Sequence, residues 1–461
     1  MSPKPQLTLN LALLIIVLGI GGGFQYGLHA SVISSPSVYI QTFINKTWQN
    51  RYGFPLHQET LTLLWSFIIS VYSIGGFLGA LSIRYLSVRF GRKKTLLYNN
   101  ISAILGAALM GFSKILGSFE MVMLGRFVYG VNAGVGLSIH MMYTGESAPR
   151  QLRGLITVSA ALFIGLGKLT GLILSLRELL GSEALWPLVM AISGLPALLQ
   201  LATLPFFPDA PRYLLIDKGD KEGCEQAMRK LWGDRDHQAE MDDMLAEKAA
   251  IHGEKGKSLV ELMCQRAVRW QFLTLLLVCG GLQFIGINVV YFYSYDIFYS
   301  AGISTAQISY VALGMGITEV LTVVLCKVYT WMPYCSTMLI FILLLSFGIG
   351  PGGVSCPLPS EIFNQSYRPA AFVFTSVMNW IGLLILGFIF PFIVEGLGSF
   401  CFIFFLVFCL LMAIFVFLIV PETKGKSIVE IMEEFHQLNY GGKKENIEKQ
   451  MDSNLLFATR L

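Results

Sequence analysis

Glutamate and arginine recur at one separation in two distant parts of this 461-residue chain. Glu146 precedes Arg153 by seven residues, and Glu361 precedes Arg368 by seven residues. Opposite charges at helix ends can pair in one conformation and separate in another, so such a pair can act as a two-state element. We interpret such charges at helix ends as a charged gate, and the recurring spacing as a sign of an internal repeat. The alternative is that basic loop residues only fix orientation, which does not explain Glu146.

Neutral polar and aromatic residues form a second set, because they stand inside long apolar stretches. They are Gln25, Tyr26, Gln283, Asn288, Asn379 and Trp380. Amides and phenols supply hydrogen-bond donors and acceptors, and the aromatic rings supply an apolar surface. The set fits a buried site for an uncharged polar ligand. The alternative is that the amides join neighbouring helices of a bundle.

Sites of other kinds are not indicated. The eight cysteines are scattered without a CxxC pair, so neither a metal site nor a disulfide framework is predicted. The glycine-rich stretches at 21–23 and 348–353 are not followed by Lys-Ser or Lys-Thr, which phosphate-binding loops require. We therefore expect no enzyme, no cofactor, no metal and no nucleic-acid partner.

The elements that carry these residues are apolar segments of membrane-spanning length. Hydrophobic residues make up 54% of the chain and charged residues only 13%, against roughly 25% charged in soluble domains. Segments of about 20 apolar residues match the length of a helix that crosses a bilayer. Eleven occur, at 8–33, 61–83, 96–115, 120–143, 155–179, 186–206, 271–296, 306–326, 334–358, 370–391 and 398–420. We predict an all-α polytopic membrane protein, with the first segment retained and not cleaved as a signal peptide.

Basic residues orient the predicted spans. The turn after the second segment holds Arg89, Arg92 and Lys93, so it is expected to be cytoplasmic. The long connection after the first segment is poor in basic residues and contains Asn45-Lys-Thr, a glycosylation acceptor pattern. We therefore predict that this connection faces outward and that Asn45 is a glycosylation site.

Two landmarks repeat with nearly one period. Glu361 follows Glu146 by 215 residues, and Pro421 follows Pro208 by 213. The repeat predicts two helical halves, at 1–207 and 270–420, joined by a cytoplasmic linker of short amphipathic helices at 208–269 and followed by a cytoplasmic tail at 421–461. The second half has five apolar segments where the first has six. One span is therefore expected to be missing, which leaves eleven spans and not twelve.

Motifs along nearly the whole chain carry a family resemblance. They are Phe24-Gln-Tyr-Gly27, Phe90-Gly-Arg-Lys93, Gly125-Arg126, Glu146 to Gly154, Pro208 to Leu215, Gln283 with Gly286 and Asn288, Tyr291-Phe-Tyr293, Gly350-Pro-Gly352, Arg368-Pro-Ala-Ala371, Asn379-Trp380 and Pro421 to Gly425. In this order they resemble the facilitative hexose transporters, in the sugar-porter branch of the major facilitator superfamily. The resemblance is to class II members and implies glucose and fructose as substrates, a multi-pass protein of the plasma membrane and a major facilitator fold. It also places the missing span between the eighth and tenth helices of the family.

The resemblance implies roles for both sets of residues. Gln25, Tyr26, Gln283, Asn288, Asn379 and Trp380 correspond to positions that bind hexose. A cytoplasmic gate is expected from Arg92, Arg126, Glu146, Arg153, Glu361 and Arg368. The chain departs from the family pattern at Ala161, Leu282 and Glu319, so the resemblance does not extend to a preferred hexose. No sequence feature indicates an oligomeric state.

Two charges inside predicted spans are unusual, because a charge near the membrane centre is costly. Lys168 and Glu319 each lie about thirteen residues into their segments, at similar depth. By resemblance their helices face each other across the boundary between the halves, so a buried ion pair is predicted. The alternative is that each faces a watery cavity independently.

Three functions follow from these observations. The leading one is energy-independent hexose transport by alternating access. A proton-coupled sugar symporter would need a titratable group in the site, for which Glu319 is the candidate. A chain that does not transport and acts only as a membrane interaction protein is the third, because of the missing span.

Overall fold

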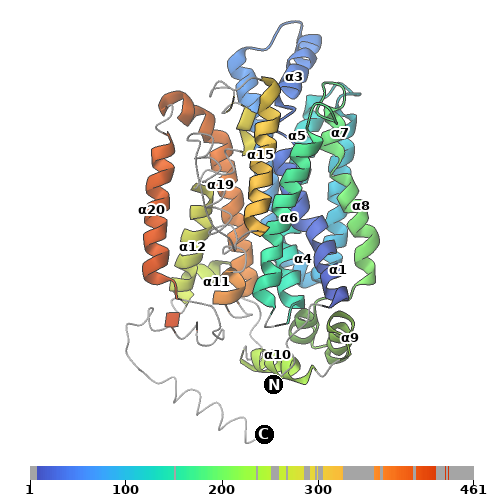
Figure 1. The fold of residues 1–461 in the computed structure, drawn as a ribbon, viewed down its shortest axis with the longest axis vertical. Helices are drawn as coiled ribbons and strands as arrows, with labels where there is room; N and C mark the ends of the chain where they lie inside the picture. Colours follow the sequence, from blue (N-terminus) through green and yellow to red (C-terminus); the bar gives the residue numbers. More distant parts are fainter. Residues whose placement is uncertain are drawn as a thin grey trace, which may run out of the picture.

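The computed structural model describes residues 8–149, 152–234, 237–250, 259–265, 268–284, 291–295, 298, 305–324, 358–363, 367–397, 401–421, 431 and 434–435. Every regular element within these ranges is helical. Helices stand side by side along the long axis, with α3 (Ser37–Tyr52) at one end of the molecule and α9 (Lys221–Trp232) and α10 (Gln238–Ala250) at the other (Figure 1). The all-α membrane fold predicted from the sequence is therefore observed.

The first half begins with a continuous helical run, α1 (Leu9–Gly19), a π-helical turn η1 (Ile20–Phe24) and α2 (Gln25–Ser31). Helix α4 (Gln58–Ser113) comprises two membrane-length helices that meet at Gly91, whose φ of 82° only glycine adopts readily. Helices α5 (Phe119–Ser147) and α6 (Arg153–Leu174) follow. The last apolar segment forms α7 (Trp186–Ala191), α8 (Gly194–Thr203) and the 3₁₀ turn η2 (Leu204–Phe206).

Small residues bring α4 and α5 into backbone contact. A Cβ atom on Gly130 would lie 2.0 Å from the Tyr72 carbonyl oxygen, and one on Gly75 would lie 2.1 Å from the Phe127 carbonyl oxygen. Close approach through small residues is how helices associate in a bilayer, where apolar side chains gain little by leaving lipid. These glycines therefore fix the helices that carry Tyr72 and Arg126.

The second half comprises α12 (Arg269–Phe284), residues 291–295, α15 (Thr305–Val324), α18 (Leu358–Ile362), α19 (Arg368–Leu397) and α20 (Cys401–Ile419). Helix α19 packs against α4 of the first half, and α15 packs against α6. Ten of the eleven predicted apolar segments contain these helices. Residues 334–357 of the remaining segment lie outside the described residues.

Short helices cover one end of the bundle. They are the π-helical turn η3 (Tyr213–Asp217), α9, α10 and α11 (Leu259–Cys264). Helix α9 buries Cys224, Ala227, Met228 and Leu231, the i, i+3, i+4, i+7 spacing of one helix face. Burial also raises the pKa of the Cys224 thiol to about 11. From the tail, Ile431 and Phe435 are buried in a cluster with Leu262 of α11 and Ile362 of α18, so this part of the tail lies at the same end.

Five helical stretches among the described residues are long and apolar enough to cross a membrane. They are Leu9–Ser31, Gln58–Ser113, Phe119–Ser147, Trp186–Phe206 and Arg368–Phe388, and Ser159–Leu174 is a shorter apolar helix. The 56 residues of Gln58–Ser113 are enough for two crossings of about 20 residues each.

Candidate functional site

Three aromatic side chains meet where α19 packs against the first half. The Trp380 ring lies edge-on to Tyr26 of α2, with ring centroids 5.7 Å apart, and edge-on to Tyr72 of α4, at 5.1 Å. Trp380 is fully buried, and its ring occupies the space that a side chain on Gly76 would fill. We call Tyr26, Tyr72 and Trp380 the aromatic cluster.

Polar groups in and beside the aromatic cluster have no protein partner among the described residues. They are the Nε1 of Trp380, the hydroxyl of Tyr72 and both amide atoms of Gln25. Gln25 is fully buried and precedes Tyr26 directly. Buried polar atoms are nearly always hydrogen-bonded, so a group of them at one place calls for a polar ligand or water. The arrangement can bind a hydroxylated molecule against aromatic surfaces.

The structure brings together some of the predicted ligand-binding residues. Tyr26 and Trp380 are in contact, and the buried Gln25 directly precedes Tyr26 in α2. Asn379 precedes Trp380 on α19 and is partly buried. Gln283 lies in α12, but its side chain is not described. Asn288 lies outside the described residues. Tyr72 was not predicted, because an aromatic residue in an apolar helix looks like ordinary core.

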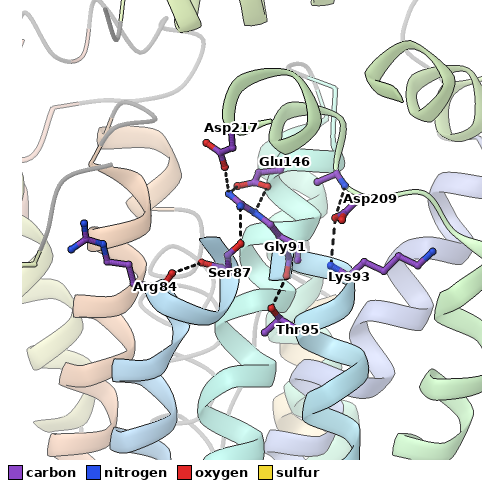
Figure 2. A network of polar contacts seen from close by, with 10 residues as sticks. Arg84, Ser87, Gly91, Lys93, Thr95, Glu146, Asp209 and Asp217 are labelled. Carbon is purple, nitrogen blue, oxygen red and sulfur yellow. Dashed lines mark hydrogen bonds and ion pairs between the residues drawn. The ribbon is translucent and has the colours of Figure 1, made fainter. Parts of the chain in front are cut away.

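A charged cluster lies at the end of the bundle that carries η3 and α9 (Figure 2). Arg92 Nε and Nη2 donate to the two carboxylate oxygens of Glu146 at 2.8 and 2.7 Å. The same Nη2 lies 3.0 Å from Asp217 Oδ2, and the guanidinium lies 4.2 Å from the centroid of the Tyr213 ring. Arg92 and Glu146 are 2% and 4% exposed. We call Arg92, Glu146, Tyr213 and Asp217 the charged cluster.

Backbone geometry and the linker hold this cluster in place. Gly91 turns the chain between the two helices of α4, and a Cβ atom there would lie 2.9 Å from the Tyr213 hydroxyl. The Lys93 ammonium donates to the carbonyl oxygens of Pro205 and Phe207 at 2.7 and 2.6 Å. Burial raises the pKa of the Tyr213 hydroxyl, which stays neutral beside Arg92. The ring thus presents its π face to the guanidinium, an arrangement that arginine favours.

Sequence reasoning missed Asp217 and Tyr213. Both lie in the linker, whose many alternating charges look like a solvated surface. A usable signal was available, because Tyr213 lies inside the motif Pro208 to Leu215 and Asp217 follows that motif by two residues.

The second half contributes Arg368 to this region. Arg368 begins α19 and is 5% exposed, and its charge attracts the Glu146 carboxylate more weakly than Arg92 does. Its Nη2 also donates to the Phe363 carbonyl oxygen at 3.3 Å. Arg153 begins α6, and Glu361 lies in α18. The side chains of these two residues are not described.

The grouping of Arg126 with the cytoplasmic gate is corrected by the structure. Arg126 and Glu146 lie on the same continuous helix α5, twenty residues or about 30 Å apart. Arg126 is fully buried, donates from Nη1 to the His29 carbonyl oxygen at 2.9 Å and lies 4.4 Å from the centroid of the Tyr72 ring. It therefore belongs beside the aromatic cluster and not with the charged cluster.

The remaining predicted residues have partial outcomes. Lys168 is buried on α6, and its helix packs against α15 as expected, but the Glu319 side chain is not described, so the ion pair stays a prediction. Asn45 lies on α3, at the end of the molecule opposite α9 (Figure 1). No group of three or more His, Cys, Asp or Glu residues that could hold a metal ion occurs in the part of the chain that the structure describes.

Comparison with known proteins identifies the family of this chain. The family model described as "Sugar (and other) transporter" matches residues 14–330 and 320–435. The chain belongs to the sugar transporter family. This sugar transporter is 42% identical to facilitated glucose transporter member 11 of Homo sapiens, over 93% of the chain and 94% of the relative. It is 37% identical to member 5 of Ovis aries, over 94% of the chain and 93% of the relative. It is thus a membrane transporter and not an enzyme.

Solved structures share the fold of this sugar transporter. The major facilitator superfamily proton:xylose symporter XylE bound to 6-bromo-6-deoxy-D-glucose matches with a TM-score of 0.79 and 21% identity, over 92% of this chain and 98% of that chain. The inward-open conformation of XylE from E. coli matches with a TM-score of 0.66, over 92% and 99%. The major facilitator fold predicted from the sequence is confirmed.

The two matches of the family model meet at residues 320–330. This is where the sequence predicts a missing span. The alignment with member 11 spans 464 positions but uses 93% of 461 residues, which is about 429, so about 35 positions of the alignment have no residue in this chain. These findings agree with the predicted deletion, and the count of eleven spans stays a prediction.

Proposed function

We propose that this protein is a facilitative carrier of hexoses such as glucose and fructose in the plasma membrane. The observation that carries the proposal is the aromatic cluster, where Trp380 meets Tyr26 and Tyr72 beside the fully buried Gln25 amide. Membership of the sugar transporter family supports the substrate class. The relatives named as facilitated glucose transporters support energy-independent transport.

The chemistry of a hexose matches this site. A pyranose ring has apolar C–H faces, which pack on an indole, and a rim of hydroxyls that both donate and accept hydrogen bonds. The Gln25 amide can accept a hydrogen bond from one sugar hydroxyl at its oxygen and donate one to another from its nitrogen. Trp380 Nε1 can donate to a further hydroxyl, and the Tyr72 hydroxyl can donate to or accept from one. Neutral partners suit a substrate that must bind and leave in every cycle.

Alternating access requires a contact between the halves that opens and closes. Arg92 and Glu146 both belong to the first half, and Asp217 belongs to the linker. The charge of Arg368, from the second half, attracts Glu146 more weakly than that of Arg92. We infer that opening this end separates Arg368 from Glu146, while the bidentate bond between Arg92 and Glu146 stays closed.

The test is uptake of radiolabelled glucose and fructose by proteoliposomes that contain the purified chain. Trp380→Leu should reduce the rate at low hexose concentration about tenfold or more, the factor that about 1.4 kcal/mol of lost binding gives. Trp186→Leu is the matched control, because Trp186 is equally buried but packs on Phe43. Equal loss in the two variants would contradict the assignment of the aromatic cluster.

The same assay separates the alternatives. Helical residues Leu9–Ser31 contain no Asp or Glu, whereas α15 contains Glu319. An inward proton gradient should leave hexose uptake unchanged for a facilitative carrier and should drive accumulation for a symporter. Absence of uptake by the folded wild-type chain would favour an interaction protein that does not transport, the function suggested by the break at 320–330.

A further inference from the structure

A buried lysine of the first half contacts an aromatic ring of the second half. Lys168 on α6 is 3% exposed, and its Nζ lies 4.1 Å from the centroid of the Tyr291 ring, which is 1% exposed. A cation this close to a ring face is attracted by the negative π surface. The attraction grows when water is excluded, as it is around both of these side chains.

The chain around Tyr291 joins both halves. The Tyr293 hydroxyl donates to the Gly387 carbonyl oxygen of α19 at 2.6 Å. Gly387 follows Trp380 by seven residues, which is about two helical turns and places both on one side of α19. Residues 291–295 are therefore attached to α19 near the aromatic cluster through Tyr293, and to α6 through Tyr291.

Lys168 also lies at the depth of the residues that flank the aromatic cluster. A Cβ atom on Gly27 would lie 2.9 Å from the Lys168 backbone nitrogen and 2.1 Å from the Ile164 carbonyl oxygen. Gly27 directly follows Gln25 and Tyr26, so the backbone of α2 touches α6 at the level of Lys168. If residues 291–295 move relative to α6, the movement therefore takes place next to the aromatic cluster.

We propose that Lys168 is a positioning residue for transport, whose ammonium ion holds the Tyr291 ring, and with it residues 291–295, against α6 while the charged cluster is closed. The contact breaks when the two halves rock. This inference rests on the proposed function, because it assigns Lys168 a role in the cycle of the same carrier. Lys168 acts through Tyr291 and need not touch the sugar.

The strength of such a contact sets the expected effect. A cation–π contact changes an equilibrium or a rate by about two- to thirtyfold, depending on how far it is desolvated. Lys168→Met removes the charge and keeps an unbranched side chain, whereas Lys168→Arg keeps a cation. Tyr291→Leu removes the ring, and Tyr291→Phe keeps it. Lys114→Met is the matched control, because the Lys114 ammonium contacts the Glu183 carbonyl oxygen within the first half.

Zero-trans hexose uptake by proteoliposomes should test the rate. Lys168→Met and Tyr291→Leu should each change the maximal rate about two- to thirtyfold, and the half-saturating concentration by less. The double variant should behave like either single variant, and Lys168→Arg, Tyr291→Phe and Lys114→Met should resemble wild type. Effects that multiply in the double variant, or a Lys168→Arg variant that fails to restore the rate, would overturn the proposal.

A second measurement separates this inference from the proposed function. If the wild-type chain carries no hexose, the proposed function fails and with it any role of Lys168 in transport. The thermal unfolding midpoints of wild type, both single variants and the double variant still test the contact. A smaller loss in the double variant than the sum of the single losses would support the contact, and additive losses would rule it out.

Discussion

At the scale of single residues, burial decides which member of the charged cluster matters most. The side chain of Glu146 is 5% exposed and accepts two hydrogen bonds from Arg92, whereas that of Asp217 is 41% exposed. A charge that is buried loses its hydration, so its stability depends on the ion pair and hydrogen bonds that its partner supplies. An exposed partner is screened by solvent and contributes little.

This contrast gives a prediction for two variants of one cluster. Glu146→Gln should lower the free energy of unfolding by about 3 kcal/mol or more, because it leaves the Arg92 guanidinium buried with only a half-exposed partner. Asp217→Asn should lower it by less than about 1 kcal/mol. Chemical unfolding in detergent micelles measures both. Similar losses would show that the buried pair is not the principal contact.

The sequence placed Arg92 and Glu146 in a predicted gate, but it did not predict that these two residues pair. Glu146 stood out because the same spacing recurs at Glu361, and Arg92 stood out within a dense basic turn. Asp217 had neither signal, since it is one acid among many in the linker. Arg126 was misplaced even though the predicted segment at 120–143 puts it near the end opposite Glu146, as the length of α5 confirms.

At the scale of elements, one glycine sets the angle between the two helices of α4. Gly91 has φ of 82°, and its α-carbon faces the Tyr213 hydroxyl. With ψ of 178° this residue lies in a region that is essentially restricted to glycine, where other residues are strained by about 1–3 kcal/mol. The turn and the approach of η3 therefore depend on the same residue.

Gly91→Ala should destabilise the protein by at least about 1 kcal/mol and weaken the contact of Tyr213 with Arg92. Gly145→Ala is the control, since Gly145 lies within α5 and a Cβ atom there meets nothing within 4 Å. That substitution should be neutral or stabilising by up to about 1 kcal/mol. The two thermal unfolding midpoints give the comparison, and a neutral Gly91→Ala would contradict the strained turn.

Apolar length predicted the spanning helices, but not the elements outside them. The segment between the first two spans was expected to be a connection, and the structure forms α3 there. That helix buries Ser37, Ile40, Ile44 and Thr47, and it packs Tyr39, Phe43 and Trp48 partly buried against the core. Its stability comes from packing on the bundle, which the sequence does not reveal.

At the scale of the whole molecule, the two ends of the chain bear on the number of crossings. The tail residues Ile431 and Phe435 are buried with Leu262 of α11, and the α1 residue Asn10 donates from Nδ2 to the Lys230 carbonyl oxygen of α9 at 2.8 Å. Both ends thus contact the linker helices. An odd number of crossings would put them on opposite sides.

We therefore predict that epitope tags at both termini label only after the cell membrane is permeabilised. One apolar segment between 306 and 358 would then not cross the membrane fully. The basic residues after Pro421 favour the same side. A tag inserted after Tyr52 should label on intact cells and serves as the control. A C-terminal tag that labels on intact cells would instead establish eleven complete crossings.

The repeat allowed the two-halved architecture to be predicted, and the family model and the fold of XylE agree with it. The contacts between the halves were not predictable in the same way. Trp380 against Gly76, and Lys168 against Tyr291, join residues far apart in sequence with no shared motif. Each contact depends on a helix rotation that periodicity leaves undetermined.

If Asn45 is glycosylated, as the sequence predicts, its place in the fold has a consequence for biosynthesis. In the folded protein the side-chain amide oxygen Oδ1 of Asn45 accepts a hydrogen bond from the Leu56 backbone N–H at 3.1 Å, and Thr47 of the same tripeptide is buried. A glycan-transferring enzyme needs both residues in an accessible, extended peptide. Sugar attachment would have to precede the docking of α3, so its extent would record how long the nascent chain stays open in the secretory lumen.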